Sequence, residues 1–186
     1  MTRFAMIMDT RRCIGCHSCT VACKVKNELP VDMIYNPVFT PPPIGVFPNV
    51  HMNFYPLICM HCDEPPCVEC CPTGASQQSE DGIVWVDPDK CIGCKACIQA
   101  CPYHARHLNR VTGVVQKCDF CKEPAREGLE PYCVKTCHQR ARIFGDLDDP
   151  QSAVSRLLNS IHSVQLLPEL GTDPQVYYIV YNGGQE

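Results

Sequence analysis

Sixteen of the seventeen cysteines fall into four motifs of four, and their spacing is that of metal ligands. The third motif is the most regular: Cys91, Cys94 and Cys97 stand at every third residue, and Cys101 follows after a four-residue step. Thiolates are the form of cysteine that binds metals, and a tight loop with Gly93 in its first step can turn three of them inward. The first chemistry that the sequence offers is therefore metal binding by thiolates.

The other three motifs are variants of this pattern. The first has the spacing of the third, the second has two extra residues in its middle step, and the middle step of the fourth holds eleven residues. The candidate ligands are Cys13, Cys16, Cys19 and Cys23; Cys59, Cys62, Cys67 and Cys71; Cys91, Cys94, Cys97 and Cys101; and Cys118, Cys121, Cys133 and Cys137. In bacterial ferredoxins such a loop gives three cysteines to one cluster and the fourth to its neighbour. Sixteen ligands predict four [4Fe–4S] clusters, and Cys70 is left over.

Zinc binding and radical chemistry are two other interpretations of the motifs. Structural zinc sites take two cysteines from each knuckle and have no use for a third and a fourth, so zinc is the less favoured alternative. A radical enzyme would need a C-x3-C-x2-C loop, but the residues that would complete it are Lys26, Gly74, His104 and Arg140. The spacing therefore favours iron–sulfur clusters.

Length, net charge and missing motifs exclude several classes of protein. The 186 residues suffice for one compact unit or two small ones, and a net charge of −4 without a basic stripe excludes nucleic acid as an expected partner. No stretch approaches the roughly 18 apolar residues of a membrane span, and Asp9, Arg11 and Arg12 interrupt the early apolar run, so no signal peptide is expected. The sequence has no glycine-rich phosphate loop and no nucleophile elbow, so we expect no catalytic residue.

Short elements of both kinds are expected around the cysteines. We predict strands at 3–9, 49–57, 83–86, 141–145 and 176–181, a hairpin over 104–117, a helix over 18–27, and a helix capped by Asp149 or Ser152 that runs through Val154 and Leu158. Residues 28–48 carry six prolines and are predicted to form an extended surface loop, which favours docking of a partner slightly over a plain connection. The fold class is therefore α+β.

Residues beside the motifs receive weaker expectations. Cys70 is expected to be a small buried residue, and the four histidines near ligands are expected to pack or hydrogen-bond: His17, His61, His104 and His138. Ten of the sixteen basic residues lie within three positions of a ligand, among them Arg12, Lys24, Lys90, Lys95, Lys117 and Lys122. They either offset cluster charge and raise the reduction potentials, or they are solvated surface.

The second motif with its surroundings resembles a known family. Cys59-x2-Cys62-Asp-Glu-Pro-Pro-Cys67-Val-x2-Cys71-Pro-Thr-Gly-Ala75, Cys101-Pro-Tyr103, Gly145-Asp-Leu-Asp148 and Gly171-Thr-x-Pro-x-Val-Tyr177 resemble the iron–sulfur subunit of the dimethyl-sulfoxide-reductase family of molybdopterin oxidoreductases. The resemblance covers essentially the whole chain and is greatest to the subunits of polysulfide, thiosulfate, tetrathionate and arsenate reductases. It identifies the type of subunit well and the substrate poorly.

The resemblance implies a single unit over 1–186 that contains two pseudo-symmetric ferredoxin-like modules. The outer module takes 1–27 and 115–146 and the inner module 49–114, with 28–48 as the proline-rich loop and 147–186 as a C-terminal extension. The implied ligands are Cys13, Cys16, Cys19 and Cys137 for cluster 1; Cys23, Cys118, Cys121 and Cys133 for cluster 2; Cys59, Cys62, Cys67 and Cys101 for cluster 3; and Cys71, Cys91, Cys94 and Cys97 for cluster 4. Some relatives replace the cysteine that matches Cys94, but this chain keeps it. It departs from the family at His138, where proline is usual, and at Cys70, where an aliphatic residue is usual.

The function implied by the resemblance is electron transfer without catalysis. Electrons would pass through the clusters between a quinone-linked membrane subunit and a catalytic subunit that carries molybdopterin with Mo or W, with cluster 1 nearest the catalytic subunit. The protein would reach the membrane through its partners, either on the periplasmic side after folded co-export or in the cytoplasm. A free-standing polyferredoxin and a structural zinc protein are the alternatives.

Overall fold

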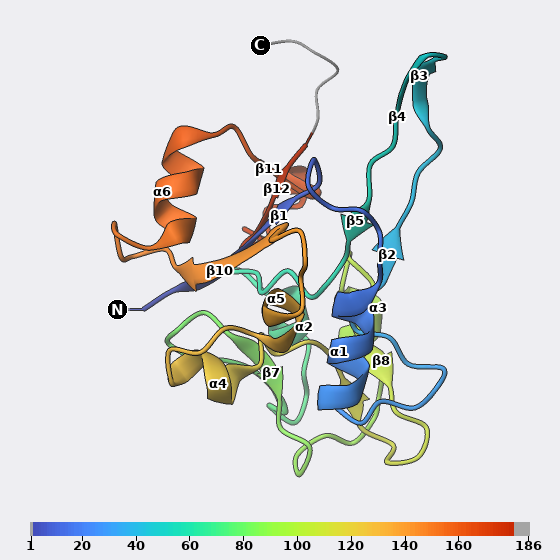
Figure 1. Ribbon diagram of the computed structural model, residues 1–186. Helices are drawn as coiled ribbons and strands as arrows, with labels where there is room; N and C mark the ends of the chain where they lie inside the picture. Colours follow the sequence, from blue (N-terminus) through green and yellow to red (C-terminus); the bar gives the residue numbers. More distant parts are fainter. Residues whose placement is uncertain (1, 181–186) are drawn as a thin grey trace.

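A four-stranded sheet forms one layer of the computed structural model, which describes residues 2–180 (Figure 1). Its order is β10 (Arg142–Asp146), β1 (Phe4–Asp9), β12 (Val176–Ile179) and β11 (Val164–Gln165). β1 runs antiparallel to β10 and parallel to β12, with Met6 opposite both Phe144 and Val176. β1 is apolar along most of its length because both of its faces are covered, and Ala5 and Met8 are at most 1% exposed.

The helix α6 (Ala153–Ser160) covers one face of this sheet. Val154 is fully buried against Ala5 and Ile7 of β1. The Ser152 side chain accepts a hydrogen bond from the Ser155 amide at 3.1 Å, so Ser152, rather than Asp149, caps the helix. The predicted helix and one of its two predicted caps are confirmed.

The cysteine motifs lie on the opposite face, where Met6 and Met8 of β1 pack among cysteines. Short helices join the motifs: α1 (Ser18–Lys26), α2 (Pro66–Glu69), α3 (Ala96–Ala100), α4 (Lys122–Arg126) and α5 (Tyr132–Lys135). Helix α1 packs on α5, and α2 packs on α3. Cysteines of the first and fourth motifs are thereby brought together, and so are cysteines of the second and third.

Two-stranded hairpins complete the chain, together with the 3-10 turn η1 (Pro168–Leu170). The pairs are β2 (Val38–Phe39) with β5 (Tyr55–Pro56), β3 (Ile44–Val46) with β4 (Asn49–His51), β6 (Ser76–Gln78) with β7 (Val84–Val86), and β8 (His107–Leu108) with β9 (Val115–Gln116). The β3–β4 hairpin projects away from the rest of the molecule (Figure 1). No helix within residues 2–180 has the length and apolar character needed to cross a membrane.

Two predicted elements need correction. The proline-rich stretch 28–48 is not merely an extended loop, since it contains β2 and β3. The strand expected over 49–57 is two strands, because β4 pairs within the projecting hairpin whereas β5 returns to pair with β2. The strands at 3–9, 83–86 and 141–145, the helix at 18–27 and the hairpin over 104–117 are confirmed within a few residues. The last strand begins at Val176 as predicted, and Tyr181, its predicted end, lies outside the described residues.

Candidate functional site

The loops of the first and third motifs have the same backbone shape. Gly15 and Gly93 stand in the first step of each loop with φ values of +66° and +65°. His17 and Lys95 then adopt the left-handed conformation with φ values of 59° and 66°, immediately before helices α1 and α3. Such angles are costly for residues with a Cβ, so the loops hold a tightly curved conformation that wraps the chain around its cysteines.

Three cavities are each lined by four cysteines, of which three come from one motif and one comes from another. We call these groups cysteine sets: set 1 is Cys13, Cys16, Cys19 and Cys137; set 2 is Cys23, Cys118, Cys121 and Cys133; set 4 is Cys71, Cys91, Cys94 and Cys97. The cavities measure about 390, 370 and 320 Å³, including the space at their mouths. Their similar size fits three copies of one group.

The remaining four ligand candidates, Cys59, Cys62, Cys67 and Cys101, form set 3 and are all buried. Burial raises the pKa of Cys62 to about 12, and the charges of Cys59, Cys67 and Cys101 contribute to the rise, so the four thiols are neighbours. The structure therefore brings the sixteen cysteines together in four sets of four. These sets are not sites for a single metal ion: among residues 2–180, no group of three or more cysteine, histidine or acidic side chains has the arrangement needed to hold one ion.

Several sulfur atoms accept hydrogen bonds. The amide of Ser76 donates to Cys71 Sγ at 3.3 Å, that of Ala141 to Cys137 Sγ at 3.3 Å and that of Val115 to Cys91 Sγ at 3.5 Å. Side chains donate as well, from Asn27 to Cys23 Sγ at 3.5 Å and from Arg106 to Cys67 Sγ at 2.8 Å. Donors aimed at sulfur stabilise thiolate charge, which is what ligands of an iron–sulfur cluster carry.

The four sets differ in exposure and in the acidity of their thiols. Of the seventeen cysteines, all described, only Cys16 of set 1 and Cys94 of set 4 are exposed. Hydrogen bonding with the Ser18 hydroxyl and amide lowers the pKa of Cys16. In set 2, burial followed by the charges of neighbouring thiols raises the pKa of Cys23 to about 12, and burial raises the pKa of Cys121 to about 11. Sets 1 and 4 therefore each expose one cysteine, whereas sets 2 and 3 expose none.

Two buried arginines beside the sets were missed by sequence reasoning. Arg106 and Arg142 are each 3% exposed, and each stands five residues after the last cysteine of a motif. That repeated Cys-x4-Arg spacing is the signal that could have found them. Lys117, which the sequence did single out, is also buried and donates to the carbonyls of Val84 and Cys118. By contrast, Arg12, Lys90 and Lys95 are exposed, so the solvated-surface interpretation holds for these three.

One of the four histidines has its expected packing role, whereas Cys70 is less buried than expected. His61 is fully buried, accepts a hydrogen bond from the Val84 amide at 3.1 Å and stacks on Phe120 at 3.6 Å, as a packing role requires. The other three histidines are exposed, which does not fit a packing role, and their alternative hydrogen-bonding role stays a prediction: His17, His104 and His138. Cys70 is only partly buried, because it ends helix α2 at its C-cap and rests against the apolar cluster around Val84.

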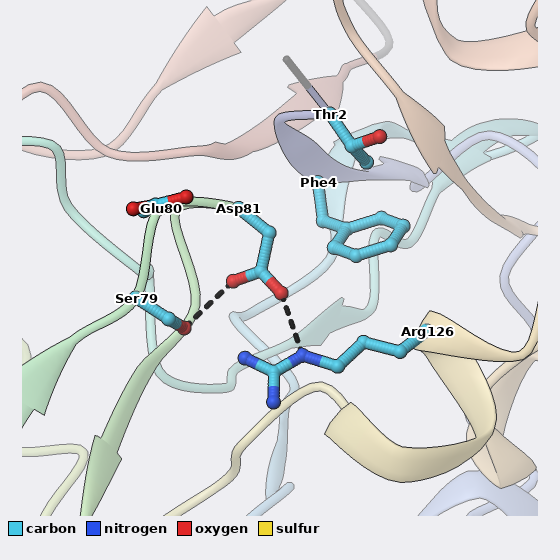
Figure 2. A pocket seen from close by; sticks show the side chains of 6 residues that line it. All are labelled: Thr2, Phe4, Ser79, Glu80, Asp81 and Arg126. Atoms are coloured by element: carbon cyan, nitrogen blue, oxygen red, sulfur yellow. Dashed lines mark hydrogen bonds and ion pairs between the residues drawn. The ribbon is translucent and has the colours of Figure 1, made fainter.

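One large groove contains no cysteine. Figure 2 shows its lining: Thr2, Phe4, Ser79, Glu80, Asp81 and Arg126. Asp81 accepts hydrogen bonds from Arg126 Nε and from Ser79 Oγ, both at 2.7 Å. Burial raises the pKa of Asp81, but these bonds together with the Ile83 amide outweigh burial and lower it. The ion pair between Asp81 and Arg126 therefore connects the β6–β7 turn to helix α4 inside this groove. No cysteine lines the groove, so it is separate from the cysteine sets.

Comparison with known proteins agrees with this chemistry. A family model described as a 4Fe-4S dicluster domain matches residues 50–147, and one described as a 4Fe-4S binding domain matches residues 10–26. The chain is 44% identical to a tetrathionate reductase subunit of Salmonella typhimurium, over 95% of this chain and 72% of the relative. It is 41% identical to a selenate reductase subunit of Mesobacillus selenatarsenatis, over 95% and 72% of the two chains.

A protein of Halobacterium salinarum assigned as an iron–sulfur subunit of dimethyl sulfoxide reductase is 41% identical, over 96% of this chain and 79% of the relative. Identity at this level over most of both chains, together with the matching [4Fe–4S] domains, establishes the family. The chain belongs to the iron–sulfur subunits of the dimethyl-sulfoxide-reductase family of oxidoreductases: it is a non-catalytic, electron-transferring subunit with ferredoxin-type [4Fe–4S] domains.

Proposed function

We propose that this subunit carries four [4Fe–4S] clusters and relays electrons between a quinone-linked membrane subunit and a molybdopterin catalytic subunit that holds Mo or W. The observation that carries the proposal is the crosswise arrangement of the sixteen motif cysteines into four sets of four. Sets 1 to 4 would bind clusters 1 to 4. Three cysteines of each set come from one motif and the fourth from another, as the ferredoxin rule requires.

The surroundings of the sets fit such clusters. Backbone amides donate to sulfur in sets 1 and 4. Near sets 3 and 4, the buried Arg106 Nε and Nη1 have no hydrogen-bond partner within residues 2–180 and can donate to an anionic group. When bound, the clusters supply reversible one-electron chemistry. The chain's own residues would supply the thiolates, limit the access of water to sets 2 and 3 and donate hydrogen bonds to sulfur.

Two pseudo-symmetric modules are supported by how the motifs pair. Helix α1 packs on α5 in the outer module, residues 1–27 and 115–146, and α2 packs on α3 in the inner module, residues 49–114. His61 and Phe120 stand at the same place in the second and fourth motifs, and their rings stack on each other. Contact between equivalent residues is expected where a twofold axis relates two repeats. The loop 28–48 and the extension 147–186 lie outside this repeat.

A linear order is supported by the exposure of the sets. Cys16 and Cys94 occupy the same place in the first and third motifs and are both exposed, which suits sets 1 and 4 as the two ends of the relay. The resemblance seen in the sequence implies that cluster 1 would lie next to the catalytic subunit. An open groove beside Cys16 and Cys137 is lined by Val21, Val25 and Tyr132, which suits contact with another protein.

The projecting hairpin favours a bound subunit over a free polyferredoxin. Val46 and Phe47 at its end are 82% and 87% exposed, and Ile44 and Val50 beside them are also exposed. A freely diffusing carrier gains nothing from exposed apolar side chains, whereas a subunit can bury them against a partner. Membrane association would come through partners, either on the periplasmic side by folded co-export or in the cytoplasm.

Metal analysis of the anaerobically purified native complex tests the proposal. We expect sixteen irons and sixteen sulfides for each copy of this chain, no zinc, and a molybdopterin-bearing large subunit. Cys16→Ser should lose or convert one cluster and block quinol-linked turnover. The matched control is Cys70→Ser, which removes the one cysteine outside the four sets and should leave the iron content at sixteen. Zinc in place of iron, or a stable monomer that serves several enzymes, would contradict the proposal.

A further inference from the structure

Arg106 and Arg142 each lie between two cysteine sets. Both side chains are nearly inaccessible to water, and a guanidinium keeps its positive charge in proteins. Among residues 2–180, neither pairs with a carboxylate. A buried charge without a partner is strongly unfavourable, so each arginine needs an anionic group nearby. The groups that can supply negative charge beside both arginines are the thiolates of the cysteine sets.

Arg106 connects set 3 to set 4. Its Nη2 donates to Cys67 Sγ of set 3 at 2.8 Å and to Ser76 Oγ at 2.7 Å. The same side chain lines the cavity of set 4. Burial lowers the pKa of Arg106, but the charges of Cys67, Cys59 and Cys97 outweigh burial and raise it. These three thiols come from both sets.

Arg142 connects set 1 to set 2 in the same manner. It lines the cavity of set 1. Its Nη2 donates at 2.6 Å to Asn36 Oδ1 and its Nη1 contacts Met6 Sδ at 3.8 Å, and both of these residues line the cavity of set 2. Burial lowers the pKa of Arg142, and the charges of Cys133, Cys19 and Cys137 outweigh it. Thiols of both sets again face one guanidinium.

The two arginines reach equivalent places from different positions in the chain. Arg106 faces Cys67 and Cys97, and Arg142 faces Cys133 and Cys19, which are the matching cysteines of the other module. Arg142 stands five residues after Cys137, where the inner module has Ser76 after Cys71. The inner module takes its arginine instead from the segment after Cys101, and Ser76 accepts its hydrogen bond. Simple duplication of one module would have kept the arginine at matching positions.

We propose that Arg106 and Arg142 are positioning residues that each set the reduction potentials of the two clusters in one module. A fixed positive charge between two clusters favours the electron that either cluster gains, and it weakens the repulsion when both are reduced. Arg106 would act on clusters 3 and 4, and Arg142 on clusters 1 and 2. This inference rests on the proposed four-cluster relay.

Redox titration followed by electron paramagnetic resonance tests Arg106 in the purified complex. Arg106→Gln should shift two of the four one-electron transitions to more negative potential and leave the other two close to their wild-type values. Arg106→Lys keeps the charge and should shift the same two transitions less. Lys95→Gln removes an exposed charge beside Cys94 and serves as the control, because solvent already screens that charge.

Arg142 can be tested without removing it. Asn36→Asp preserves the size of a side chain that is 1% exposed and replaces the amide nitrogen, Nδ2, which has no hydrogen-bond partner within residues 2–180. The new carboxylate would neutralise Arg142 from the position where Asn36 Oδ1 already accepts its hydrogen bond. We expect Asn36→Asp and Arg142→Gln to lower the same two potentials, and these should be the two that Arg106→Gln leaves unchanged.

Iron content separates the possible failures. Variants with sixteen irons whose four potentials match the wild type would overturn the role of the arginines and leave the relay intact. A shift of all four potentials together would also overturn it, because the inference assigns two clusters to each arginine. Wild-type complex with fewer than sixteen irons would instead refute the four-cluster relay itself.

Discussion

Sets 1 and 4, which we propose as the ends of the relay and call the end sets, use the same ligand as sets 2 and 3, its proposed interior or inner sets, in different surroundings. Sets 1 and 4 each expose one cysteine, and hydrogen bonds lower the pKa of Cys16. The pKa of Cys71 in set 4 is lowered too. Burial alone would raise it, but hydrogen bonds from Ser76, Thr73 and Ala75 outweigh burial. Sets 2 and 3 expose no cysteine: those of set 3 are buried, and those of set 2 are partly or fully buried. Burial first and neighbouring thiols second raise the pKa of Cys118 well above its usual range.

This difference separates two tasks within one chain. In the proposed relay, sets 1 and 4 would lie where electrons enter and leave, because each of them exposes one cysteine at the surface. Two cysteines of sets 2 and 3, Cys62 and Cys133, pack in the core with Met6 and Tyr178, whereas set 1 gives the same core one cysteine, Cys19. In so small a chain the cofactors must replace part of the apolar core, and loss of an inner set should therefore damage the fold more than loss of an end set.

The largest effect is expected at the inner Cys118. Cys118→Ser would remove a proposed ligand of set 2 and leave a hydroxyl at a site where burial raises the pKa of the thiol well above normal. We expect holoprotein yield to fall at least about tenfold, since cluster insertion and folding are coupled. Anaerobic purification with iron determination measures this. Normal yield with sixteen irons would contradict both the ligand role and the core role.

A smaller effect on folding, but a large one on turnover, is expected at the exposed Cys94. Cys94→Ser should leave a folded complex that keeps clusters 1 to 3, because water can solvate the altered ligand. Quinol-linked turnover should fall at least about tenfold, whereas turnover with a reduced dye that reaches set 1 should be retained. Equal loss with both donors would show that set 4 is not the quinone-side end.

The thiol pKa values predict how cluster retention depends on pH. Protons compete with iron for thiolates, so a thiol of higher pKa gives up iron at higher pH. Burial raises the pKa values of Cys23 in set 2 and Cys62 in set 3 to about 12. Sets 1 and 4 are mixed, because hydrogen bonds lower the pKa values of Cys16 and Cys71 while burial raises those of Cys13 and Cys97. Sets 2 and 3 should therefore release iron at higher pH than sets 1 and 4.

The measurement is the equilibrium cluster content between about pH 6.5 and pH 9.5 in the presence of an iron chelator, approached from both loading and unloading. Retention should rise with pH at every set. Electron paramagnetic resonance should show the signals of the inner sets lost first as pH falls. Retention that does not vary with pH would refute thiolate competition, and earlier loss of the end sets would refute the ranking of the thiols.

Sequence spacing predicted the [4Fe–4S] chemistry, which the family models confirm, because cluster loops are local structures; the sixteen ligands stay a prediction. Four cysteines within eleven residues, with Gly93 in the first step, require nothing from the rest of the chain to suggest their role. The elements β1 and α6 were also predicted, because their hydrophobic patterns are local features of the sequence. The pairing of motifs came from family resemblance, since spacing alone does not say which motif lends its fourth cysteine to which.

The remaining features depend on contacts between distant segments. Helices α2 and α5 are four residues long, too short for a periodic pattern, although Pro65 and Pro131 before them are a usable start signal. The strand expected over 49–57 is divided because its two halves find different partners. Burial of Arg106 and Arg142 follows from the packing of two motifs around each side chain, and charged residues are expected on the surface when only the sequence is known.

The smallest expected effects lie within the end sets, at Gly15 and Gly93. Both have positive φ, so alanine costs about 1–2 kcal/mol at either site. A Cβ at Gly15 would meet the ring of Phe54, a side chain that can rotate away, whereas a Cβ at Gly93 would meet the carbonyl oxygen of Gly113 in the β8–β9 turn. Gly93→Ala should therefore destabilise by roughly 1 kcal/mol more than Gly15→Ala, since backbone must move.

Unfolding of cluster proteins is irreversible, so the rate of cluster bleaching in urea is the appropriate measurement. Gly93→Ala should bleach roughly fivefold faster than Gly15→Ala if most of that difference appears in the unfolding barrier. The faster phase should belong to cluster 4 in Gly93→Ala and to cluster 1 in Gly15→Ala. Equal rates would mean that the β8–β9 turn yields as easily as a phenylalanine ring, and the two end sets would then be alike in rigidity as well as in exposure.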